Sequence, residues 1–162
     1  MTNVNGTLVP SQEASLSVSN RGFAYGDAVF ETLRVINGKI MFWEEHYFRL
    51  MSSMRIMRME IPADFSPEFL EQEIKDLLEA SQLLSSPARV RFSAYRKEGG
   101  FYSPSTNDVG YVITAEALSS PFYLLSEDFY EVELFKDHFV NSGLLSTIKT
   151  NNKAIHVLGS IY

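Results

Sequence analysis

The chain has 162 residues, 45% hydrophobic and 21% charged, which suits one globular domain, or one domain and part of another. A net charge of -6 argues against a nucleic-acid-binding surface as the main role, zero cysteines exclude disulfides and thiolate catalysis, and three scattered histidines predict no metal site. No apolar run is long enough to span a bilayer and no secretory signal is visible, so we expect a cytoplasmic protein with no membrane partner.

The first strands are predicted from short apolar and β-branched runs. Residues 7–9 have the pattern of an edge strand, which a proline ends. Residues 29–36 and 39–42 are predicted to form two further strands, and only Asn37 and Gly38 separate them. That dipeptide predicts a hairpin with a type I′ turn, because both of its positions need positive φ.

The side chains of residues 29–36 alternate between two faces of the predicted sheet. One face carries Val29, Glu31, Leu33 and Val35, and the other carries Phe30, Thr32, Arg34 and Ile36. Arg34 stands among aromatic and aliphatic neighbours. It is therefore either a charge at the rim of the sheet or part of a pocket for an anion, and the alternation does not decide between them.

Two amphipathic helices are predicted next. Apolar side chains recur at helical spacing over residues 43–57, and Ser66 with Pro67 marks the start of the second helix as N-cap and first helical residue. Arg49 lies beside the apolar stripe of the first helix, where a solvated charge is the usual role. His46 on the same helix is expected to be structural.

The sheet is predicted to continue after the helices. Residues 88–96 and 110–117 alternate as strands, and a Gly-containing loop joins them. Arg96, Phe101 and Tyr102 are candidates for a pocket at this loop, and an ordinary surface hairpin is the alternative. Residues 1–118 are therefore predicted to be an α+β domain, an antiparallel sheet with two helices.

A second region is predicted beyond the linker at 118–121. Residues 129–135 alternate again and are expected to start a second sheet, so residues 122–162 are predicted to begin a second domain. The sequence stops at Tyr162 within an apolar helical run that no capping residue closes. We therefore expect this chain to be part of a longer polypeptide.

Lys149 follows an apolar, hydroxyl-rich run and precedes a helix-like segment. This order predicts an amine at the end of a strand and near the N-terminus of a helix. Partial burial and the helix dipole both disfavour the ammonium form, which favours a nucleophilic free amine. A surface lysine is the alternative.

Three stretches resemble the class IV aminotransferases: RGFAYGDAVFET at 21–32, EHYFRL at 45–50 and LSTIKTNN at 145–152. These are pyridoxal-phosphate (PLP) enzymes of fold type IV, and they include D-amino-acid and branched-chain aminotransferases and aminodeoxychorismate lyase. The resemblance implies an N-terminal two-layer α/β domain and the start of a C-terminal PLP-binding domain.

The resemblance also implies PLP as the cofactor and assigns residues to it. Lys149 would be the catalytic residue, which forms the internal imine with PLP and then shuttles a proton. Arg49 would bind the PLP phosphate through paired, charge-assisted hydrogen bonds. Lys153 is a weaker candidate for the imine. The expected substrate pocket consists of Tyr25, Phe30, Arg34, Arg96 and Tyr102.

The resemblance implies a homodimeric aminotransferase that moves an amino group from a small amino acid to a 2-oxo acid. Aminodeoxychorismate lyase activity and a non-catalytic binding or assembly domain of the same fold are the alternatives. The loop between the predicted strands at 88–96 and 110–117 lacks the Arg-x-His motif that holds the substrate carboxylate in D-amino-acid aminotransferases. Phe30-Glu31-Thr32 also stands where branched-chain enzymes usually have Phe-Glu-Gly. Neither specialisation is therefore assigned.

Overall fold

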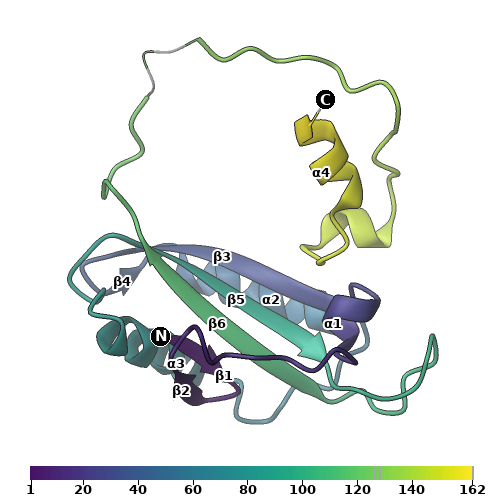
Figure 1. The fold of residues 1–162 in the computed structure, drawn as a ribbon, viewed down its shortest axis with the longest axis horizontal. Helices are drawn as coiled ribbons and strands as arrows, with labels where there is room; N and C mark the ends of the chain where they lie inside the picture. Colours follow the sequence, from purple (N-terminus) through teal and green to yellow (C-terminus); the bar gives the residue numbers. More distant parts are fainter. Residues whose placement is uncertain (126, 128, 162) are drawn as a thin grey trace.

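The computed structural model describes residues 1–125, 127 and 129–161. They form one antiparallel sheet of six strands in the order β2-β1-β6-β5-β3-β4 (Figure 1). The strands are β1 (Thr2–Val4), β2 (Thr7–Val9), β3 (Ala28–Ile36), β4 (Lys39–Ile40), β5 (Ala88–Arg96) and β6 (Val109–Ala117). The helices are α1 (Arg21–Ala24), α2 (Trp43–Ile56), α3 (Pro67–Ala80) and α4 (Ala154–Ile161), with a 3₁₀ turn at Leu144–Thr147.

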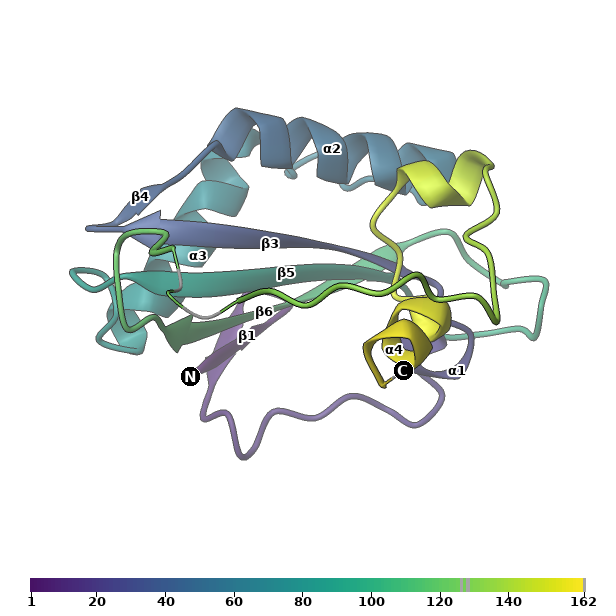
Figure 2. The same cartoon turned by 90° about the horizontal axis from the view of Figure 1, so that it is seen from above.

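The helices α2 and α3 cover one face of the sheet, and the chain after β6 arches over the other face (Figures 1 and 2). The predicted α+β arrangement of an antiparallel sheet and two helices is confirmed. The core between the two layers includes Val29, Leu33, Val35, Val90, Phe92, Ile113, Leu50, Met54, Leu70, Ile74, Leu77 and Leu78. Burial of each large apolar side chain contributes roughly 1.5–3 kcal/mol to folding.

The hairpin between β3 and β4 forms at the predicted dipeptide. Asn37 and Gly38 have φ values of 49° and 73°, so both occupy the left-handed region that the turn requires. The second strand is shorter than predicted, because β4 ends at Ile40. Phe42 has a φ of 56° and directly precedes α2, so the chain has left the sheet to begin the helix.

The helix α3 begins as the sequence predicts. Ser66 is the N-cap, and its hydroxyl accepts a hydrogen bond of 3.1 Å from the Phe69 N–H. Pro67 occupies the first turn, where its missing N–H costs nothing. The predicted strands at 88–96 and 110–117 correspond to β5 and β6 within one residue.

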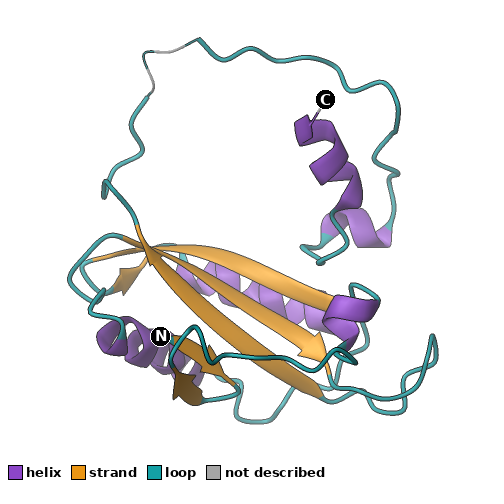
Figure 3. Cartoon of the chain, in the orientation of Figure 1, coloured by secondary structure: helices purple, strands orange, loops and turns teal. Residues whose placement is uncertain are grey.

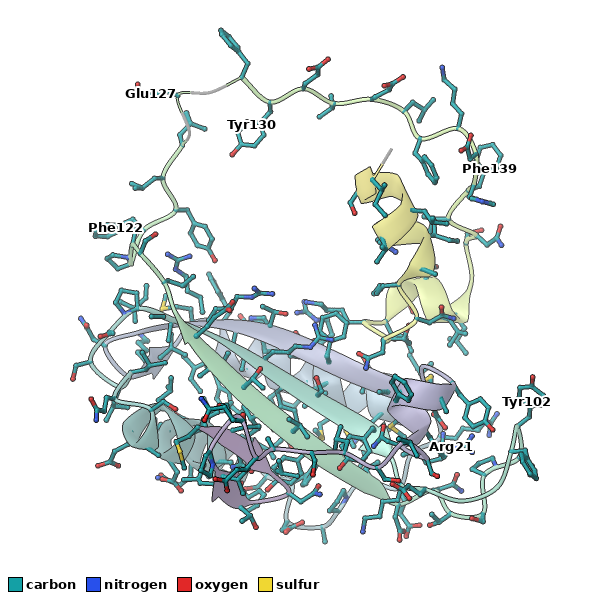
Figure 4. The ribbon with its side chains drawn as sticks, in the orientation of Figure 1. Arg21, Tyr102, Phe122, Glu127, Tyr130 and Phe139 are labelled. Carbon is teal, nitrogen blue, oxygen red and sulfur yellow. The ribbon has the colours of Figure 1, made fainter. Side chains whose placement is uncertain are left out.

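The linker differs from its prediction. Residues 129–135 were predicted as a strand, and this was wrong, because they form neither helix nor strand (Figure 3). Phe129, Tyr130 and Leu134 are exposed there, and Tyr130 lies on a segment far from the sheet (Figure 4). A strand needs a neighbour to satisfy its hydrogen bonds, and the described strands all belong to the single sheet. A second domain at 122–162 stays a prediction.

The described residues also limit two kinds of site. None of their helices has the length and apolarity that crossing a membrane requires. Among these same residues, no three histidine or acidic side chains converge in an arrangement that could hold a metal ion. At the end of the linker, residues 149–151 return to the sheet and contact β3.

Candidate functional site

The chain returns after the linker and pairs with the free edge of β3. Val29 and Thr150 form an antiparallel bridge, and the Phe30 N–H donates to the Lys149 carbonyl over 2.9 Å. Ile148 and Thr150 are buried, whereas most of the linker before them is exposed. The segment therefore docks on β3 through alternate side chains. It places Lys149 beside the edge of β3 and before α4, near the N-terminus of a helix as predicted, but Lys149 does not end a strand, because residues 148–150 form only an isolated bridge.

The Lys149 amine has an environment that favours its neutral form. Burial lowers the pKa of Lys149 below its ordinary value, because desolvation disfavours the ammonium ion. The carboxylate of Glu31 acts in the opposite direction, and the positive charges of Arg49, Arg91 and Lys153 lower this pKa further. Lys149 and Arg49 thus lie within electrostatic reach of one another at the same edge of the sheet.

Glu31 is a buried carboxylate that holds Arg49. Its side chain is 2% exposed and lies on the core-facing side of β3. Arg49 donates from Nε to Glu31 Oε1 over 2.7 Å and from Nη2 to Glu31 Oε2 over 2.5 Å. This pairing is the largest of the influences that raise the Arg49 pKa. His46 Nδ1 lies 2.8 Å from Glu31 Oε2, so the acid joins two side chains of α2.

A cavity of about 600 Å³ opens on the sheet face opposite α2 and α3, next to residues 148–153, which we call the Lys149 segment. Its lining includes Phe30, Arg91, Ser93, Asn151 and Lys153. The Arg91 guanidinium carbon lies 3.7 Å from the centre of the Phe30 ring, and Nη2 donates to Asn151 Oδ1 over 3.1 Å. Burial lowers the pKa of Arg91. Among the described carboxylates, none forms an ion pair with Arg91, so this cavity presents an uncompensated cation.

A second cavity of about 320 Å³ lies beside the Gly-rich loop that precedes β3. It brings together three of the predicted pocket residues, Tyr25, Arg96 and Tyr102, with Thr150 and Asn152 on either side of residue 151. The Tyr25 and Tyr102 ring centres are 5.8 Å apart in a tilted arrangement. The two aromatic rings and the Lys149 segment therefore border the same space.

Arg96 touches this second cavity, but its donors serve the fold. Its Nε donates to Asp27 Oδ2 over 2.9 Å, and Nη2 donates to the Met57 carbonyl over 2.6 Å. Its Nη1 donates to Asn107 Oδ1 over 2.6 Å and to the Arg58 carbonyl over 3.2 Å. The residue is 5% exposed. Arg96 therefore lines the cavity with a guanidinium whose three nitrogens already donate to protein atoms.

Arg34 is not brought together with Lys149. It lies four residues beyond Phe30, which is about 13 Å along a strand. Its side chain donates to the carbonyls of Ser120, Pro121 (3.2 Å) and Phe122 (3.1 Å) and stacks on a tyrosine of the linker. Arg34 thus fixes the start of the linker.

Two residues of this site were not singled out from the sequence. Glu31 could have been found, because the alternation of β3 places an acid on the buried face, where a carboxylate needs a partner. Arg91 gave a weaker signal: the alternation of residues 88–96 puts it on the outward face, but nothing in the spacing shows that Phe30 lies beneath it.

Known proteins resemble this chain in sequence and in fold. A family model for class IV aminotransferases matches residues 28–161. A D-alanine aminotransferase of Listeria monocytogenes is 34% identical over 76 residues, which are 47% of this chain and 24% of that protein. The chain therefore spans about a quarter of the length of this curated relative.

Solved structures share the fold. A branched-chain amino acid aminotransferase of T.th., complexed with N-(5'-phosphopyridoxyl)-L-glutamate, has a TM-score of 0.64 and 29% identity, covering 73% of this chain and 40% of that chain. A 4-amino-4-deoxychorismate lyase from Pseudomonas aeruginosa has a TM-score of 0.57 and 28% identity, covering 72% and 40%. The family model spans most of the sequence and the fold agrees with it. The chain belongs to the class IV aminotransferase family, as its motifs predicted.

Proposed function

We propose that the intact protein is a PLP-dependent aminotransferase that moves an amino group from a small amino acid to a 2-oxo acid. The observation that carries this proposal is the docking of Lys149 on β3, where its carbonyl accepts from the Phe30 N–H over 2.9 Å and its partly buried amine lies within electrostatic reach of Arg49. A lowered pKa increases the fraction of free amine, which is the form that attacks a carbonyl.

The donors at this edge of β3 fit PLP by their chemistry. Arg49 is 45% exposed along its side chain, and its bonds to Glu31 use only Nε and Nη2. We propose that Nη1, which has no hydrogen bond within the described residues, points to the PLP phosphate, while Glu31 and His46 hold the guanidinium in place. When bound, PLP supplies an electron sink for the carbanion at the substrate Cα.

We propose that Lys149 is the catalytic base. Its free amine would take the proton from the substrate Cα and deliver it to the C4′ carbon of PLP, which requires the amine to stay beside both atoms. The Phe30 ring, whose centre is 5.1 Å from Lys149 Nζ, excludes water from one side of the amine. Both groups are held by the same strand, so their spacing is set by the fold.

The substrate side of the proposed site faces the two cavities. Arg91 is proposed to receive the carboxylate of the amino acid, because it lacks an acidic partner within the described chain and stacks on Phe30. Tyr25, Phe30 and Tyr102 are proposed as pocket walls. Arg96 is proposed to support the wall of the Tyr25–Tyr102 cavity.

The decisive experiment fixes PLP to the intact protein with borohydride and locates the added mass. The proposal expects a PLP-modified Lys149 in the native protein, and no modification at this position and no amino transfer in Lys149→Ala. The control variant Lys39→Ala alters an exposed lysine and should behave as the native protein. A binding or assembly domain without catalysis would show no fixed PLP in either case.

A lyase is the second candidate, which the similarity to 4-amino-4-deoxychorismate lyase supports. The two activities share the cofactor and differ in the bond that is broken, so product analysis separates them. Release of pyruvate from 4-amino-4-deoxychorismate without a 2-oxo acid acceptor would favour the lyase. Amino exchange between an amino acid and a 2-oxo acid would favour the transferase.

We also propose that the intact protein is a homodimer in the cytoplasm. Family membership supports the dimer, and the exposed aromatic side chain of Phe101 offers an apolar contact for a second copy. Light scattering on the intact protein tests this point, since a monomer at all concentrations would contradict it. Fractionation of cells that express the protein tests the location.

A further inference from the structure

Arg21 is a buried charge in the wall of the Tyr25–Tyr102 cavity, and the proposed function gives it no role. It begins α1, yet only 3% of the residue is exposed. Its Nε donates to Asp27 Oδ2 over 2.9 Å, and its guanidinium carbon lies 4.8 Å from the centre of the Tyr25 ring. Taking a guanidinium out of water is costly unless its donors are satisfied, so these partners are specific requirements of the site.

The rest of the Arg21 side chain is bound by a single loop. Nη1 donates to three successive carbonyls, those of Gly99 (3.1 Å), Gly100 (3.4 Å) and Phe101 (2.7 Å). Such convergence needs a tightly curled backbone. Gly99 and Gly100 have φ values of 120° and 72°, and a Cβ on Gly100 would collide with the Ser103 carbonyl oxygen. The loop is therefore shaped around the guanidinium.

Asp27 keeps Arg21 from moving. The same Oδ2 atom that accepts from Arg21 also accepts from Arg96 Nε over 2.9 Å. Arg96 is in turn bound to the Met57 carbonyl after α2. Two buried arginines thus share one carboxylate oxygen, and the network ties the loop to β5 and to the end of α2.

The loop that Arg21 shapes carries Tyr102 to the cavity. Arg21 lies at the base of this loop and Tyr102 lies farther out (Figure 4). Tyr102 is 92% exposed, and its ring contact is with Tyr25 at 5.8 Å between centres. The cavity between these rings also borders Thr150 and Asn152, which follow Lys149 in the chain. The position of Tyr102 therefore sets how much space remains beside these two residues.

We propose that Arg21 is a positioning residue for substrate selection: by gathering the carbonyls of residues 99–101, it sets Tyr102 against Tyr25 and fixes the width of the cavity that Thr150 and Asn152 border. This rests on the proposed function, because the cavity is taken as the substrate side of the site. Arg21 itself touches neither the amine nor the proposed phosphate contact. Its loss should therefore change substrate binding and leave attachment of PLP intact.

The test compares Arg21→Met and Arg21→Lys with Arg55→Met, which makes the same change at an exposed arginine of α2. In the PLP-loaded intact protein, Arg21→Met should raise KM for the amino donor about tenfold, with kcat within about threefold. Trypsin should also cleave faster after the exposed Lys97, at the start of the loop. Arg21→Lys should lie between, because an ammonium can pair with Asp27 but cannot also reach three carbonyls. Arg55→Met should match the native protein.

Two more variants decide the matter if Arg21→Met does not fold. Gly100→Ala deforms the loop and leaves Arg21 and Asp27 in place, and Tyr102→Leu removes an exposed ring that the core does not need. Both should raise KM with little change in kcat, and Gly100→Ala should also speed cleavage after Lys97. Unchanged KM and unchanged cleavage in the folded variants would overturn the proposal, as would a fall in kcat at constant KM.

Failure of the proposed function gives a different result. If borohydride fixes no PLP to Lys149 in the native protein, the proposed function fails, and the trypsin comparison still tests whether Arg21 orders the loop. If PLP is fixed normally in every variant while KM and cleavage stay unchanged, only the role of Arg21 is lost.

Discussion

Lys149 Nζ lies 5.1 Å from the centre of the Phe30 ring, and the same two residues are joined by a backbone hydrogen bond of 2.9 Å. The face of the ring attracts an ammonium ion, whereas burial and the nearby cations disfavour it. Burial and the cations of Arg49, Arg91 and Lys153 lower the pKa of Lys149, and the carboxylate of Glu31 opposes them. The amine is thus held in one place and biased toward its reactive form.

The first prediction concerns the pH at which PLP attaches to Lys149. Because the Lys149 pKa is below its ordinary value, borohydride-fixed PLP should reach half its maximum at a lower pH than an exposed lysine would show. Lys153→Ala removes a neighbouring cation, so the pKa rises and the midpoint moves to higher pH. Glu31→Gln removes the opposing anion, so the midpoint moves to lower pH. Mass spectrometry across a pH series measures both, and shifts in the same direction would contradict this account.

The second prediction concerns the stability that Glu31 provides. Glu31→Leu leaves Arg49 and His46 without their shared acceptor, but Arg49 is 45% exposed and can regain water. The free energy of unfolding should therefore fall by about 1–3 kcal/mol, less than for a fully buried pair. Urea unfolding measures the change. Glu116→Gln breaks an exposed pair with Arg89 and should cost less than about 1 kcal/mol.

The third prediction concerns Arg34 and the linker. Arg34→Gln removes the donors that bind the carbonyls of Ser120, Pro121 and Phe122. Chymotrypsin should then cleave faster near the exposed Tyr123, while fixation of PLP to Lys149 stays at the native level. A raised KM with unchanged cleavage would instead support the substrate-pocket role that the family resemblance implies for Arg34.

The fourth prediction tests the core between α3 and the sheet. Leu77 is fully buried, so Leu77→Ala should lower the free energy of unfolding by about 2–5 kcal/mol through lost burial and a residual cavity. Leu134→Ala makes the same change at an exposed linker position and should alter it by less than about 0.5 kcal/mol. Equal effects of the two substitutions would mean that the linker packs against the rest of the protein.

Much of the fold could be predicted, because buried side chains recur at every second residue of a strand and at every third or fourth residue of a helix. The alternation of β3 identifies its core face, and Ser66 with Pro67 marks the start of α3 through local hydrogen bonding alone. The strand expected at 129–135 failed for a physical reason: alternation reports which side chains could be buried, but a strand also needs a neighbour, and none is described there.

The site could be predicted only in part. Lys149 and Arg49 stand within motifs, and the structure brings them to one edge of β3. The Arg96 guanidinium donates to Asp27 and to the Met57 carbonyl, which lie outside β5. The spacing of residues within β5 therefore could not show that these donors are bound by protein atoms and not by a substrate. Arg91, five residues earlier on the same strand, escapes such partners because it points to the outward face.

The bridge between Val29 and Thr150 has a mechanical consequence. The bridge returns the chain to β3 after the linker. The Lys149 amine is therefore attached to the N-terminal sheet, although Lys149 follows the linker in sequence. Lys149 and Phe30 are therefore joined directly, by a backbone hydrogen bond and by the contact between the amine and the ring. The position of the amine is thus fixed by β3 and does not depend on the course of the linker that precedes it.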